Sequence, residues 1–166
     1  ENAAIFCVYF FEAITAWQYF SAQFVPRISL ALRLILFVLG YGLGLVFFNM
    51  STVWLNILFF LLINFLLLKV SYTCSWKTTF FHSSILTSLS IGTEVFTVFL
   101  LGTLLGGAEK YQTSPPILMG LCAISRISYF MITKMCLRLS PSVPVNTPEA
   151  GPSAILLGCF SLSTIF

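Results

Sequence analysis

The sequence predicts an all-α, polytopic membrane protein built as a transmembrane helical bundle. Of its 166 residues, 58% are hydrophobic and only 8% are charged, and the mean hydropathy is +1.00. Soluble domains carry about 25% charged residues, so this composition excludes an ordinary water-soluble fold. Apolar runs of about 20 residues recur, and each is long enough to cross a hydrocarbon core. The runs are continuous rather than alternating, which excludes a transmembrane barrel.

The apolar runs predict five complete helices and the start of a sixth. We expect these helices over residues 3–23, 28–48, 51–70, 80–105, 115–137 and 153–166. Together they form one transmembrane domain over residues 1–166. The chain begins with Glu1 and ends inside an apolar run, so we expect it to be a fragment of a longer protein.

Basic residues lie in or beside every second connection between the expected helices, and their positions predict the orientation of the chain. They come in three pairs, Arg27 with Arg33, Lys69 with Lys77, and Lys134 with Arg138. The alternate connections carry no charge or one charge of each sign. Because lysine and arginine accumulate on the cytoplasmic side of a membrane, we expect the N-terminus to lie outside.

Several function classes lack the residues they need. The net charge of +3 is not gathered into a basic cluster, so we expect no nucleic-acid partner. The chain has one histidine and no aspartate, which leaves no convincing catalytic set, and we expect no enzyme activity in this segment. The five cysteines have no metal-type spacing, and no nucleotide-binding motif is present. We therefore expect no catalytic, cofactor-binding or metal-binding residue here.

The stretch LTSLSIGTEVFTVFLLG (86–102) places Glu94 inside an apolar run. Polar residues around it recur at intervals of three and four, which puts them on one helix face that should point into the bundle. They are Ser83, Thr87, Ser90, Glu94 and Thr97.

Two more charged residues, Glu12 and Arg126, lie near the middle of predicted helices. A charge at the bilayer centre costs about 3 kcal/mol, so mutual compensation is expected. We expect Arg126 to pair with either Glu94 or Glu12, leaving the other carboxylate hydrogen-bonded or protonated. Asn56 and Asn64 add polar groups on a third helix. These residues fit three roles: fixing helix register, sensing a signal, or forming a proton or ion path.

Four segments together resemble a known family. They are FEAITAWQYFSAQF (11–24), LNILFFLLINFLLLKVSYTCSWKTTFFHSSIL (55–86), IGTEVFTVFLLGTLLG (91–106) and ISRISYF (124–130). This arrangement resembles the membrane sensor region of GHKL-type sensor histidine kinases, which are related to the Agr-type peptide receptors of Gram-positive bacteria. The matching features include Glu12, Glu94 and Arg126.

The resemblance implies a sensor domain in the bacterial cytoplasmic membrane. In that family a secreted extracellular peptide would be the ligand. The chain would form a homodimer, and a response regulator would be its downstream partner. ATP and Mg would be cofactors only of a kinase domain that this chain does not contain. The glycines of GYGLG (40–44) favour packing within the chain over dimerisation. A transporter or channel subunit that binds a cation or proton through the buried carboxylates is the alternative, and a membrane protease is a weaker third.

Overall fold

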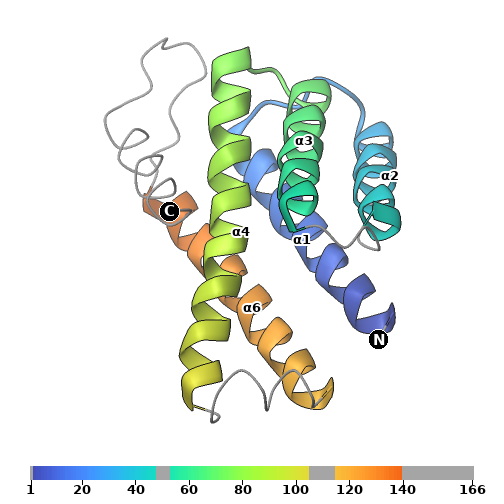
Figure 1. The fold of residues 1–166 in the computed structure, drawn as a ribbon. Helices are drawn as coiled ribbons and strands as arrows, with labels where there is room; N and C mark the ends of the chain where they lie inside the picture. Colours follow the sequence, from blue (N-terminus) through green and yellow to red (C-terminus); the bar gives the residue numbers. More distant parts are fainter. Residues whose placement is uncertain (1, 48–52, 105–114, 140–166) are drawn as a thin grey trace.

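The computed structural model describes residues 2–47, 53–104 and 115–139 (Figure 1). These residues form five α-helices, with no strand beyond an isolated bridge between Pro26 and Tyr72. The helices are α1 (Asn2–Gln23), α2 (Leu30–Phe47), α3 (Val53–Ser71), α4 (Trp76–Leu104) and α6 (Pro115–Leu139). The all-helical fold predicted from the sequence is confirmed. The segment 153–166, where we expected a sixth helix, lies outside the described residues.

The helix boundaries differ most from expectation at α4, which begins at Trp76 rather than at residue 80. Ser75 explains the earlier start, because it caps the helix. Its hydroxyl accepts a hydrogen bond from the Thr78 amide at 3.2 Å, and its carbonyl accepts one from the Thr79 amide at 2.9 Å. A serine in this position satisfies amide groups that the first turn of a helix leaves unpaired.

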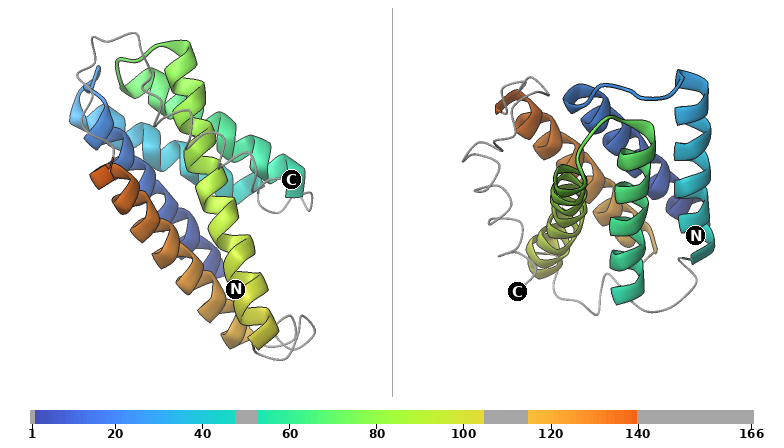
Figure 2. Two further views of the ribbon diagram at one scale, coloured as in Figure 1. Left: turned by 90° about the vertical axis from the view of Figure 1, so that its left-hand side faces the viewer. Right: turned by 90° about the horizontal axis from the view of Figure 1, so that it is seen from above.

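The five helices run alternately up and down and close into a ring. Each helix packs mainly on two others, in the order α1, α2, α3, α4, α6 and back to α1 (Figure 2). The contact between α6 and α1 joins the two ends of the described chain. Residues from helices far apart in the sequence can therefore meet inside the ring.

The bundle carries its polar residues inside and many large apolar side chains outside. Buried polar residues include Glu12, Asn64, Thr87, Ser90 and Arg126. Outward-facing apolar residues include Val38 on α2, Trp54 on α3, Phe99 on α4 and Met135 on α6. Apolar residues such as Phe20 and Leu68 are buried as well, so the bundle differs from a soluble one in its apolar surface, which in a soluble bundle is largely polar and charged.

Three of the described helices are long and apolar enough to cross a membrane. Their candidate spans are Trp54–Ser71, Trp76–Leu101 and Met119–Arg138. A shorter apolar stretch covers Leu30–Gly44 in α2. By their length and composition, these helices indicate a membrane protein.

The two connections at one end of the bundle pair with each other. The Arg27 amide donates to the Ser71 carbonyl at 2.9 Å, and the Thr73 amide donates to the Val25 carbonyl at 3.0 Å. Arg33, within the expected helix 28–48, lies in the first turn of α2. Its guanidinium stacks over the rings of Trp17 and Tyr72, at 5.0 and 5.5 Å from their centroids. The sequence therefore ties α1, α2 and α3 together at this end.

Two of the glycines of α2 permit close contacts with neighbouring helices. A methyl group at Gly44 would lie 2.6 Å from a ring carbon of Tyr9, closer than two such atoms can come, and one at Gly40 would lie 3.5 Å from Leu67. At Gly42, nothing among the described residues lies within 4 Å. Gly40 and Gly44 therefore pack within the chain, as the sequence indicated.

Candidate functional site: a buried charged triad

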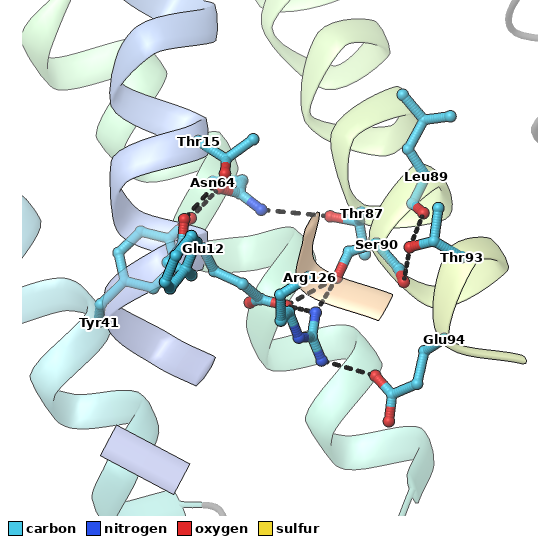
Figure 3. Close-up of polar contacts among 11 residues, drawn as sticks. Glu12, Thr15, Tyr41, Asn64, Thr87, Leu89, Ser90, Thr93, Glu94 and Arg126 are labelled. Carbon is cyan, nitrogen blue, oxygen red and sulfur yellow. Dashed lines mark hydrogen bonds and ion pairs between the residues drawn. The ribbon is translucent and has the colours of Figure 1, made fainter. Parts of the chain in front are cut away.

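Three charged residues from three helices meet inside the ring. Glu12 lies near the middle of α1, Glu94 lies on α4 and Arg126 lies near the middle of α6. Figure 3 shows the guanidinium of Arg126 between the two carboxylates. We call these residues the charged triad. The sequence named all three, and the ring packing of α1, α4 and α6 brings them together.

The inner pair of the triad is buried. Arg126 forms an ion pair through Nη1 with Oε1 of Glu12, and the side chains of Arg126 and Glu12 are only 10% and 4% exposed. Ser90 on α4 supports both groups. Its hydroxyl donates to Oε1 of Glu12 at 2.7 Å and accepts from Nη1 of Arg126 at 2.8 Å (Figure 3). Such added hydrogen bonds are what a buried ion pair needs to offset the loss of hydration.

The outer pair of the triad joins Arg126 to Glu94, whose side chain is half exposed. Nη2 of Arg126 donates to Oε2 of Glu94 at 2.7 Å. The Glu94 side chain is 52% exposed, whereas its helix neighbours Ser90 and Thr97 are buried. Glu94 therefore lies at the edge of the polar face of α4 rather than in its centre.

The structure corrects the expectation that Arg126 pairs with only one carboxylate. The guanidinium binds Glu12 through one terminal nitrogen and Glu94 through the other. A guanidinium has five N–H donors in a planar fork, so it can hold two carboxylates at once. Neither carboxylate is left without the arginine. The stripe prediction for α4 placed Glu94 on a face that points into the bundle, but its side chain is 52% exposed, so the expected burial of Glu94 is wrong.

A second polar chain crosses the ring beside the triad. The Tyr41 hydroxyl on α2 donates to Oδ1 of Asn64 on α3 at 2.8 Å, and Nδ2 of Asn64 donates to Thr87 on α4 at 3.4 Å (Figure 3). Asn64 thus has the buried role that the sequence suggested. Asn56 is half-buried and, within the described ranges, makes no hydrogen bond to the triad or to this chain. Tyr41 was missed, because an aromatic residue between glycines gives no sign of a polar partner.

Two polar atoms within the triad have spare hydrogen-bonding capacity. Oε2 of Glu12 and Nε of Arg126 are buried and have no hydrogen-bond partner among the described residues. Buried polar groups are seldom left unpaired, because each costs about 1–3 kcal/mol. The triad therefore combines a dense ion-pair network with an unused carboxylate oxygen at its buried end.

His82 is packed between aromatic side chains rather than placed at a free interface. Its Nδ1 is 2.8 Å from the Tyr19 hydroxyl, and the Phe24 ring lies edge-on at 4.9 Å between centroids. Within the part of the chain that the structure describes, no group of three potential ligand side chains could hold a metal ion. The contacts of His82 are those of a structural residue that links α1 to α4.

The triad links α1, α4 and α6 through one guanidinium, and its described residues include no nucleophile with an adjacent base. Comparison with known proteins adds no assignment. No family model matches the chain, and no curated protein and no solved structure matches it either.

Proposed function

We propose that this chain is the membrane-embedded signal-sensing domain of a two-component sensor histidine kinase. The observation that carries the proposal is the charged triad, in which one arginine joins α1, α4 and α6 across the bundle. The residues of the triad are also among the features on which the resemblance to GHKL-type sensors rests. In this proposal a secreted peptide is the signal, and a cytoplasmic kinase domain outside this chain is the output.

The triad suits a sensing role because a ligand can alter one of its two ion pairs and leave the other in place. Arg126 is held by a buried carboxylate on one side and a half-exposed carboxylate on the other. A ligand that strengthens or replaces the outer pair changes the relative stability of two packings of α4 against α6. A signal can shift such an equilibrium only by its difference in affinity for the two states.

The basic end of the bundle supports the proposed orientation. The described lysines and arginines other than Arg126 all lie near the 24–29 and 72–75 connections or at the C-terminal end of α6, and they are Arg27, Arg33, Lys69, Lys77, Lys134 and Arg138. By the positive-inside rule this end faces the cytoplasm. The N-terminus then lies outside a bacterial cytoplasmic membrane, and the kinase domain lies on the basic side.

A transporter or channel subunit is the second candidate, and one observation favours it. Oε2 of the buried Glu12 has no hydrogen-bond partner among the described residues, so it offers an unused acceptor where a proton or cation can bind. This candidate predicts ion uptake into vesicles that is lost in Glu94→Gln, with no requirement for an attached kinase domain.

The coding sequence downstream of Phe166 is the first test of the sensor proposal. A further transmembrane helix, a dimerisation helix and an ATP-binding domain are expected. The full-length protein in vesicles should then phosphorylate itself from ATP, and Arg126→Met should change the rate of this reaction, whereas Arg138→Met should not. A stop codon soon after Phe166 would overturn the sensor proposal and favour the transporter.

A further inference from the structure

We propose that Glu94 is a binding site for the cationic group of an amphiphilic ligand, an amine or guanidinium attached to an apolar body. This inference rests on the proposed function, because it assigns the chemistry of the signal that the sensor receives. It starts from the charge of the triad, the unused acceptor atoms and the exposure of Glu94.

The charge of the triad is unbalanced. Two carboxylates, Glu12 and Glu94, share the single guanidinium of Arg126. The other described cations lie at the basic end, and Lys134, two turns along α6, is exposed. With all three residues ionised, the triad carries one net negative charge inside an apolar bundle. Isolated charges in an apolar environment are costly, so a further positive charge stabilises this site and a negative one destabilises it.

The triad has an unpaired acceptor on its exposed side. Glu94 accepts one hydrogen bond within the described residues, at Oε2, which leaves Oε1 of this half-exposed side chain available. The other two unpaired atoms of the triad, Oε2 of Glu12 and Nε of Arg126, are buried and have no hydrogen-bond partner among the described residues. A ligand with N–H donors therefore finds a free acceptor at Glu94, whereas the unpaired donor of Arg126 is closed off from an acidic ligand.

The surroundings of Glu94 include apolar side chains. Ile91 and Val98, about one turn from Glu94 on α4, are half-buried, and so is Cys122 on the facing helix α6. The inner members of the triad are closed off, with side-chain exposures of 4% and 10%. A ligand bound at Glu94 therefore contacts apolar side chains, which suits a cation carried on an apolar body.

Calorimetric titration of the complete chain in phosphatidylcholine nanodiscs tests this site. The probes are octylguanidinium, octyl sulfate and octyl glucoside, which share an alkyl chain and differ in head-group charge. After subtraction of empty nanodiscs, octylguanidinium should bind one site per chain, and the other two should show only partitioning. Glu94→Gln should weaken the binding of octylguanidinium about tenfold or more, as expected for loss of one charge-assisted hydrogen bond.

Thr93→Val is the matched control. Its hydroxyl donates only to carbonyls of its own helix, those of Leu89 and Ser90, so its loss should leave octylguanidinium affinity within about twofold. Equal binding by the unaltered chain and Glu94→Gln would overturn the proposal. Saturable binding of octyl sulfate instead of octylguanidinium would also overturn it, and would identify Arg126 as an anion site. The comparison of the three probes uses the unaltered chain, so it tests the cation site even if Glu94→Gln does not fold.

This titration measures binding without a kinase domain. A missing kinase domain would overturn the proposed function while leaving the cation site intact. A kinase that responds to Arg126→Met but a chain that binds no octylguanidinium would overturn only the cation site.

Discussion

Two regions of the bundle hold buried or half-buried arginines, and they stabilise them by different means. In the charged triad, Arg126 is held by two carboxylates and a serine hydroxyl. At the basic end, Arg33 lies over the rings of Trp17 and Tyr72 and donates to the Tyr72 hydroxyl at 3.4 Å. Lys69 there likewise contacts the Trp76 ring and the Cys74 carbonyl.

The difference follows from depth in the bundle. Near the middle of α6 an arginine is far from either end, and only opposite charges offset the loss of hydration. Near the ends of helices, the cationic head lies over aromatic rings and stays close to polar surroundings. The central region thus depends on specific partners, whereas the end region tolerates change. The comparison predicts which substitutions unfold the bundle.

Removing Arg126 should have the largest effect. Arg126→Met leaves the buried carboxylate of Glu12 without a counter-charge, which costs about 3–5 kcal/mol in the free energy of unfolding. The double variant Arg126→Met/Glu12→Gln should recover part of this loss, because the unpaired charge is gone. The measurement is unfolding by dodecyl sulfate in mixed micelles, with Arg138→Met, at the exposed end of α6, as the control. If the stability losses from Arg126→Met and Glu12→Gln simply add in the double variant, the pairing of Arg126 with Glu12 is contradicted.

The two carboxylates of the triad should differ in their contribution to stability. Glu12→Gln removes the charge of a side chain that is 4% exposed and bound by both Arg126 and Ser90. It should lower the free energy of unfolding by about 2–3 kcal/mol. Glu94→Gln alters a side chain that is 52% exposed, so its cost should be about 1 kcal/mol or less. The same micelle titration compares the two, and equal losses would show that exposure does not set the strength of these pairs.

The sequence predicted the members of the triad but not how they share charge. An isolated glutamate or arginine in an apolar run is visible in any sequence, because it violates the composition of a transmembrane helix. The five described helices were predicted from the apolar runs themselves, which are as visible in the sequence. The division of Arg126 between two carboxylates depends on the ring contacts of α1 and α4 with α6, which are long-range and leave no local pattern.

Two features were missed, for different physical reasons. Tyr41 forms a buried hydrogen bond with Asn64, and nothing in the surrounding apolar run marks it as a hydrogen-bond donor. Arg33 was counted with Arg27 in predicting the orientation of the chain, which does not identify its partners. These partners, Trp17 and Tyr72, come from other parts of the chain.

Close packing next to the triad should be sensitive to one added methyl group. Tyr9, one helical turn before Glu12, packs its ring against the backbone of α2 at Gly44. Gly44→Ala would force the ring or the helix to move and should cost about 1–3 kcal/mol in the free energy of unfolding. Gly42→Ala is the matched control, since it meets nothing within 4 Å, and it should be neutral or slightly stabilising because alanine favours helix. Equal effects of the two would contradict the close approach of α1 and α2.

The smallest effect is expected at the basic end. Arg33→Gln removes two cation–π contacts and one long hydrogen bond, together worth about 1 kcal/mol. Tyr72 keeps its hydrogen bond with Ser21 at 2.7 Å, so the connection between α1 and α3 should stay in place. Arg33→Lys should retain most of the stability, because a lysine also stacks on aromatic rings, and Arg27→Gln, at an exposed position, is the control. A loss at Arg33 as large as that at Arg126 would remove the distinction between the two regions, because an aromatic cage would then hold a cation as tightly as a pair of carboxylates does.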